Sequence, residues 1–118
     1  MKYFKGRLRS IGFAWQGIND LLVSQPNARI HLFATVCVVA AGWRYEISRA
    51  DWLALLLAIA MVWVAEALNT AIELAVDLAS PDHHPLAGKA KDVAAAAVLL
   101  ASLLAVVVGL LVFVPQFI

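Results

Sequence analysis

Apolar residues in the first 25 positions recur every three or four residues, which is the period of an α-helix. They are Phe4, Leu8, Ile11, Trp15, Ile18 and Leu22, and basic or other polar residues lie between them. This pattern predicts an amphipathic surface helix over 1–25, too polar to cross a membrane and suited to its interface. Pro26 is expected to end this helix, because proline lacks the N–H group that a helix interior needs.

Three apolar stretches follow, and each is expected to be a membrane helix. They cover about 28–45, 51–79 and 92–114. The last has no charged residue from Val93 to Val114, which meets the ~20 residues needed to span a bilayer. The segment "SPDHHPLAGKAKD" at 80–92 is too polar for lipid and is expected to be a loop. The pattern therefore predicts one all-α membrane domain over 1–118, with a surface helix and three transmembrane helices.

Composition agrees with a membrane protein. Of the 118 residues, 64% are hydrophobic and 14% are charged, whereas soluble domains have roughly 45–50% apolar and about 25% charged residues. The formal net charge is only +1, so nothing in the charge supports binding to nucleic acid.

The basic residues predict how the chain is oriented. Three crossings put the amino terminus and the loop at 80–92 on the same side of the membrane. That side holds most of the basic residues, namely Lys2, Lys5, Arg7, Arg9, Arg29, Lys89 and Lys91. The other side has Arg44 and Arg49. The positive-inside rule therefore places the amino terminus and this loop in the cytoplasm.

Four polar residues interrupt the second membrane helix: Glu66, Asn69, Glu73 and Asp77. Their spacing of three, four and four puts them on one narrow stripe of a helix. An ionised carboxylate in hydrocarbon costs roughly 3 kcal/mol on insertion scales, so such a stripe usually faces a partner or a water-filled cavity. Three helices alone are expected to be too few to shield the stripe, which predicts an oligomer.

This stripe has the residue types that a phosphoryl transfer needs. One carboxylate can accept the proton of an attacking hydroxyl, and another can hold a divalent cation that bridges phosphate oxygens. Hard oxygen ligands of this kind suit Mg²⁺. The alternative is a polar seam that only specifies helix packing.

The loop before the third membrane helix adds a second group of candidates. Asp92 can cap that helix, and Lys91 lies at its amino end, where free N–H groups and the helix dipole favour phosphate. Lys91 can equally be a lysine that merely flanks the membrane. His83 and His84 are either loop surface or nucleotide contacts. The phosphate-binding loop motif of the common nucleotide hydrolases is absent.

With these residues in place, the sequence resembles the bacterial diacylglycerol kinase family of small membrane lipid kinases. The matching segments are "EALNTAIELAVDL" at 66–78, "HPLAGKAKDVAAAAVLL" and "NARIH" at 27–31, and the resemblance covers nearly the whole chain. It implies a homotrimer in the bacterial cytoplasmic (inner) membrane. Each subunit would have a surface helix and three membrane helices, with ATP as phosphoryl donor and active sites shared between subunits on the cytoplasmic side.

The resemblance also implies roles for individual residues. Glu66 matches the catalytic base, and Asn69 matches its neighbour in the lipid-hydroxyl site. Glu73 matches the carboxylate that binds metal and ATP, and Asp77 matches a supporting residue near the interface. The other matching positions lie near the nucleotide or close to the site, and they are Asp82, His83, His84, Lys91, Asp92 and Arg29.

Gln25 is a departure from the family pattern. Family members commonly have a glutamate there, which serves as a second metal ligand, so the strength of the metal site is open. Arg7 and Arg9 are both candidates for the arginine that contacts nucleotide.

The resemblance implies ATP- and Mg²⁺-dependent phosphorylation of a membrane lipid hydroxyl, on undecaprenol or diacylglycerol. The segment "HPLAGKAKD" resembles the undecaprenol kinase branch of the family more closely, and this favours undecaprenol as the substrate. One alternative is a small proton-coupled transporter or channel, because an intramembrane glutamate can serve as a proton site. Another is a catalytically inactive assembly subunit, which Gln25 leaves open.

Overall fold

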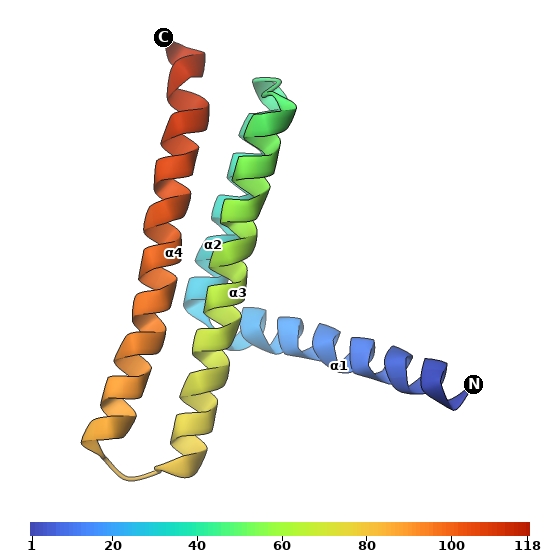
Figure 1. Cartoon of the computed structure of the whole chain (residues 1–118), viewed down its shortest axis with the longest axis vertical. Coiled ribbons are helices and arrows are strands. Elements are labelled where there is room, and N and C mark those ends of the chain that lie inside the picture. Colours follow the sequence, from blue (N-terminus) through green and yellow to red (C-terminus); the bar gives the residue numbers. More distant parts are fainter.

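The structure is a computed structural model that describes all 118 residues, and it contains four helices and no strand. They are α1 (Lys2–Ser24), α2 (Pro26–Arg44), α3 (Arg49–Ala79) and α4 (Pro85–Phe117). Figure 1 shows α2, α3 and α4 upright and α1 projecting sideways from the foot of α2. The protein is an all-α membrane protein, as the sequence predicts.

The turn between α1 and α2 depends on two adjacent residues. Gln25 has an extended backbone (φ −110°, ψ 112°), and it ends α1 while also preceding the first turn of α2. Pro26 then occupies the first position of α2, where its missing N–H group costs nothing. The prediction that the first helix ends at Pro26 is confirmed, and α2 begins slightly before the expected residue 28. This junction turns the chain from the surface helix into the upright bundle.

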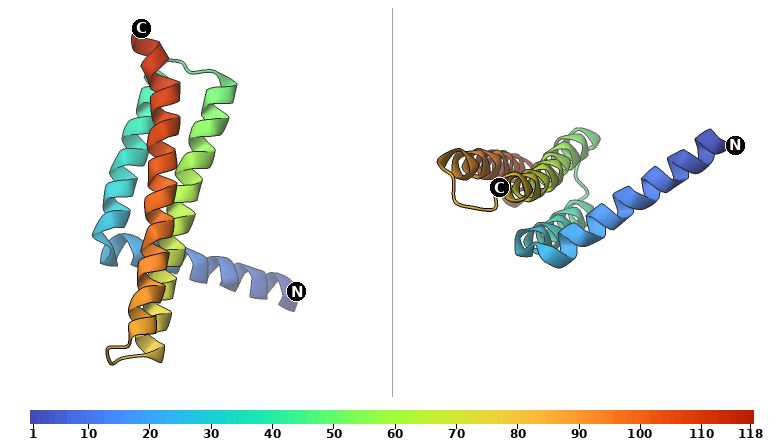
Figure 2. Two further views of the ribbon diagram at one scale, coloured as in Figure 1. Left: turned by 60° about the vertical axis from the view of Figure 1, so that its left-hand side comes forward. Right: turned by 90° about the horizontal axis from the view of Figure 1, so that it is seen from below.

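The longest helices, α3 and α4, are both long and apolar enough to cross a membrane. They form an antiparallel hairpin, and α2 packs beside α3 (Figure 2). Ser48 begins α3 by accepting a hydrogen bond from the Asp51 N–H group at 3.1 Å. The main apolar cluster contains Ile47, Leu55 and Val112, and it lies at the end of the bundle away from the loop that joins α3 to α4.

The start of α4 differs from the prediction. α4 begins at Pro85, not near residue 92, and its cap is His84, whose Nδ1 accepts from the Leu86 N–H group at 3.1 Å. Asp92 therefore lies inside the helix, and its predicted role as the cap is wrong. The reason is local, because proline is preorganised for the first helical position. The polar segment that follows Pro85 extends the helix instead of remaining a loop.

The far end of α4 also extends past the expected residue 114. Pro115 lies inside the last turn and the helix continues to Phe117. So close to a helix end, a proline removes one backbone hydrogen bond without breaking a long run of them.

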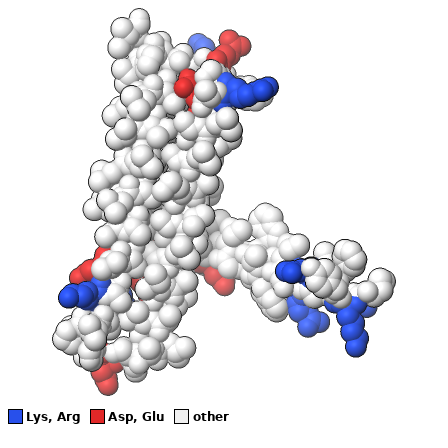
Figure 3. Space-filling view, in the orientation of Figure 1, with Lys and Arg blue, Asp and Glu red and all other residues white.

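The hairpin of α3 and α4 reaches beyond the level at which α1 lies, so the loop between them stands clear of the surface helix (Figure 1). Charged side chains gather at the two ends of the bundle and along α1, and the upright part between the ends is uncharged on this face (Figure 3). Only 13 of the 118 residues are buried within the chain. The remaining apolar surface must therefore be covered by lipid or by other subunits.

Candidate functional site

The upper half of the polar stripe, made up of Glu66 and Asn69, is buried inside the single chain. Leu55, Ala58 and Val62 form the buried line of α3, and Glu66 and Asn69 continue it. The exposed fraction of Glu66 is 1%. The expectation that one chain cannot shield the stripe is therefore wrong for this half, because α2 and α4 both pack against α3.

Glu66 faces α2, where the nearest charged or polar partner is His31. The distance from His31 Nε2 to Glu66 Oε2 is 3.4 Å. Both carboxylate oxygens of Glu66 and the facing nitrogen of His31 are buried without a hydrogen-bond partner, and so are Asn69 Oδ1 and Thr70 Oγ1. Buried polar atoms in proteins are nearly always paired. This group of unpaired atoms is suited to receiving a polar group from another molecule, such as a hydroxyl.

The lower half of the stripe, made up of Glu73 and Asp77, is progressively more exposed to solvent. Asn69 Nδ2 donates to Glu73 Oε1 at 3.4 Å, so these two residues share a face as their spacing predicts. Asp77 lies one turn further on and is exposed. It pairs with Lys91 of α4, whose Nζ lies 2.5 Å from Asp77 Oδ1. The stripe thus runs from a buried carboxylate to a solvent-accessible ion pair.

A polar pocket of about 280 Å³ lies where the stripe ends, between the last turn of α3 and the first turns of α4. Its lining includes Asp77, Asp82, His83, His84 and Lys91. The structure thus brings together the candidate residues of the loop and the last member of the stripe. Asp92 follows Lys91 on α4, is exposed, and is absent from the lining.

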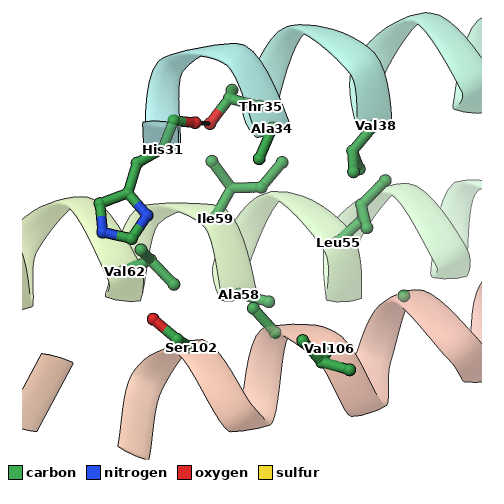
Figure 4. A pocket seen from close by; sticks show the side chains of 12 residues that line it. His31, Ala34, Thr35, Val38, Leu55, Ala58, Ile59, Val62, Ser102 and Val106 are labelled. Atoms are coloured by element: carbon green, nitrogen blue, oxygen red, sulfur yellow. Dashed lines mark hydrogen bonds between the residues drawn. The ribbon is translucent and has the colours of Figure 1, made fainter. Parts of the chain in front are cut away.

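An apolar groove lies at the other end of the stripe, among α2, α3 and α4 (Figure 4). Its volume is about 310 Å³, and 8 of its 12 lining residues are hydrophobic. His31 lies at one end, and Val38 and Leu55 lie toward the other. The groove therefore starts beside the partner of Glu66 and continues into the apolar part of the bundle.

Two further candidates, Arg29 and Gln25, lie near the α1–α2 junction, whereas Arg7 and Arg9 are exposed on the first half of α1. Arg29 Nη2 donates to the Val23 carbonyl at 3.1 Å, which ties the first turn of α2 to α1. Gln25 is half-buried at the junction itself. Because α2 and α3 are antiparallel and His31 meets Glu66, Gln25 and Glu73 both lie toward the same end of the bundle. Nowhere in the chain do three or more His, Cys, Asp or Glu side chains come together to hold a metal ion.

His31 and Thr70 were not identified as candidate residues from the sequence. The pattern of α3 alone could have indicated Thr70, because it adjoins Asn69 on the buried face. His31 could have been noticed as a polar residue early in an otherwise apolar helix, but nothing in the sequence pairs it with Glu66.

A sequence model of the family described as prokaryotic diacylglycerol kinase matches residues 12–113. The undecaprenol kinase of Bacillus subtilis (strain 168) is 38% identical over 108 residues, which cover 92% of this chain and 88% of that protein.

Two diacylglycerol kinases are also similar. The protein of Synechocystis sp. is 42% identical over 103 residues, which cover 86% of this chain and 59% of that protein. The protein of Escherichia coli (strain K12) is 29% identical over 100 residues, which cover 85% of this chain and 82% of that protein. The family model covers the second half of α1, the polar stripe and most of α4, and the chain therefore belongs to the prokaryotic diacylglycerol kinase family of membrane lipid kinases.

Proposed function

We propose that the protein transfers the γ-phosphoryl group of Mg²⁺-bound ATP to the terminal hydroxyl of a membrane lipid, and that undecaprenol is preferred over diacylglycerol. One observation carries this proposal. A single polar stripe on α3 joins an apolar groove, beside Glu66 and His31, to a charged pocket at Asp77 and Lys91. A lipid kinase needs such an arrangement, because one substrate is mostly hydrocarbon and the other is highly charged.

The lipid occupies the apolar end of the site. Its hydrocarbon chain lies in the groove among α2, α3 and α4, and its hydroxyl reaches the unpaired oxygens of Glu66. Asn69 lies one turn below and helps to orient the hydroxyl. A lipid that arrives from the bilayer moves from one apolar environment to another, so packing contacts hold its chain in the groove and the hydrophobic effect contributes little.

Glu66 is the general base in the transfer step. The lipid hydroxyl gives its proton to a Glu66 carboxylate oxygen, and its oxygen forms a bond to the γ-phosphorus. The bond between that phosphorus and the oxygen bridging to the β-phosphate breaks, and ADP leaves with the electron pair. Loss of a positioned general base typically costs about 10²–10⁴-fold in rate.

The residues present fit Mg²⁺. This ion keeps several of its waters and is commonly held by one or two carboxylates together with substrate phosphates, without a cage made only of protein ligands. Glu73 supplies a carboxylate, Gln25 can add a neutral amide oxygen from the same end of the bundle, and no larger cluster of ligands is present. When bound, the ion neutralises charge on the phosphate oxygens.

ATP binds from the charged end. The first turns of α4, beginning at Pro85, border the polar pocket, so the positive end of that helix dipole faces it. Lys91 contacts the phosphates, and Asp92 beside it supports the same region. Asp82, His83 and His84 lie beside the nucleoside, and Arg29 is close to the site from α2. Asp77 holds Lys91 in place from α3.

We further propose that the protein is a homotrimer with shared active sites. Its amino terminus and polar pocket would face the cytoplasm from the inner membrane of a bacterium. The excess of basic residues on that side supports this orientation. The lower stripe supports sharing of the sites, because the Asp77 side chain is 62% exposed and a neighbouring subunit can complete its surroundings.

The choice of lipid is tested by competition. Purified protein in detergent receives equal amounts of undecaprenol and diacylglycerol with labelled ATP, and the two phosphorylated products are separated. We expect undecaprenyl phosphate to form faster. Faster formation of phosphatidic acid would overturn the preference while leaving the lipid kinase reaction intact.

A further inference from the structure

His31 has no role in the transfer step described above, yet it is the residue of α2 that faces Glu66. His31 Nε2 and both oxygens of Glu66 are buried and unpaired, although Nε2 and Oε2 are only 3.4 Å apart. Hydrogen bonds of this type are typically 2.7–3.2 Å long. The two groups are therefore close to a hydrogen bond that the chain alone has not completed.

Two further side chains hold His31 in this position. Trp63 Nε1 of α3 donates to Thr35 Oγ1 of α2 at 3.0 Å, and Thr35 Oγ1 donates to the His31 carbonyl at 2.7 Å. The ring of Trp63 also meets the imidazole edge to face, with 6.3 Å between ring centroids. These contacts fix both the backbone and the ring of His31 relative to α3.

We propose that His31 is the positioning residue of the catalytic base. Its Nε2–H group donates to Glu66 Oε2 and holds the carboxylate so that Oε1 faces the lipid hydroxyl. This inference rests on the proposed function, in which Glu66 takes the hydroxyl proton. The contact shortens when substrate binds, because catalytic hydrogen bonds are often long before the complex forms.

The physical reason is the environment of Glu66. An ionised carboxylate this deeply buried is costly unless it accepts hydrogen bonds, and His31 is the donor within reach. During the step, the proton moves from the lipid oxygen to Glu66 Oε1, while His31 keeps its own proton throughout. A misplacement of the base by about 1 Å can cost about 10²-fold in rate, so orientation alone can decide the activity.

The kinetic test compares three variants on α2. His31→Leu removes the donor, His31→Gln keeps an N–H donor at the end of a chain of similar reach, and Phe33→Leu changes the exposed face of the same helix as a control. We expect His31→Leu to lower kcat by about 10- to 100-fold without changing the KM for ATP. His31→Gln should recover most of this loss, and Phe33→Leu should match the wild type. Normal kcat in His31→Leu would overturn the proposal, and so would equal losses in His31→Leu and His31→Gln.

A spectroscopic test does not depend on activity or on the Leu variant folding. The ¹⁵N resonances of the three histidines are recorded in the wild type and in Glu66→Gln, and that of His31 is identified with His31→Gln. The Nε2 resonance of His31 should shift in Glu66→Gln, while those of His83 and His84 stay fixed. An unchanged His31 resonance would overturn the contact. If the wild type phosphorylates no lipid, the proposed function fails, and this spectrum still decides whether His31 binds Glu66.

Discussion

Lys91 of α4 reaches across the hairpin to Asp77 of α3, and its Nζ lies 2.5 Å from Asp77 Oδ1. The contact joins two residues that are far apart in sequence and closes one wall of the polar pocket. Before nucleotide binds, Asp77 therefore partly neutralises the positive charge of Lys91, the residue that we propose contacts the ATP phosphates. Binding of ATP must therefore draw Lys91 away from Asp77 or share it with that carboxylate.

The first prediction follows from this pair. Lys91→Met removes one positive charge from the pocket and should raise the KM for ATP by about tenfold, or about 1.4 kcal/mol. The KM for the lipid should change little, because the apolar groove lies at the other end of the stripe. The matched control is Lys89→Met, which removes the same charge from an exposed position outside the pocket. Equal effects of the two substitutions on the KM for ATP would contradict a specific role of Lys91.

The second prediction concerns Gln25 and the metal. A glutamine oxygen can coordinate Mg²⁺, but it brings no charge to neutralise the ion. Gln25→Glu should therefore lower the Mg²⁺ concentration for half-maximal activity by about tenfold, or about 1.4 kcal/mol. Asn27→Asp adds the same charge to an exposed residue nearby and serves as the control. If Gln25→Glu leaves the Mg²⁺ titration unchanged, Gln25 does not face the metal.

The third prediction concerns the packing of α2 against α3. Gly42 lies so close to Trp52 that an added Cβ atom would be 2.7 Å from the ring and 3.1 Å from Ile47. Gly42→Ala should destabilise the fold by about 1–3 kcal/mol, which is typical of overpacking. Gly17→Ala is the control, because nothing lies within 4 Å of its added Cβ atom. Thermal unfolding in detergent should show a lower midpoint for Gly42→Ala only, and equal midpoints would mean that the ring moves aside freely.

The sequence was sufficient for most of the fold. The periodicity of apolar residues predicted α1, the three long apolar stretches predicted the upright helices, and Pro26 marked the first boundary correctly. The spacing of the stripe correctly placed Asn69 beside Glu73. These features depend on residues within one helix or one turn, where sequence distance and spatial distance agree.

The features that were missed depend on contacts between helices or on cap geometry. The start of α4 was misjudged because His84 acts as the cap, a role that Asp92 fits better by residue type alone. The shielding of Glu66 was misjudged because it depends on how α2 and α4 pack against α3. His31 was overlooked for the same reason, since helical periodicity does not indicate which residues of two helices meet.

The fourth prediction concerns assembly. Because the lower stripe is exposed and so little of the chain is buried, we expect an oligomer in mild detergent, and the family resemblance implies a homotrimer. Its mass can be measured by light scattering with correction for bound detergent, and activity can be assayed in the same fractions. A monomer with full activity would contradict both the trimer and the sharing of active sites.

The central claim is that Glu66 takes the proton of a lipid hydroxyl during phosphoryl transfer from ATP. The most direct measurement is the rate of lipid phosphorylation by Glu66→Gln beside the wild type, with the affinity for ATP and the oligomeric state measured on the same samples. Glutamine has nearly the same shape but cannot accept the proton, so turnover should fall by about 10²–10⁴-fold while ATP still binds normally. Turnover of Glu66→Gln within about threefold of the wild type, far short of the loss expected for a general base, would contradict the claim.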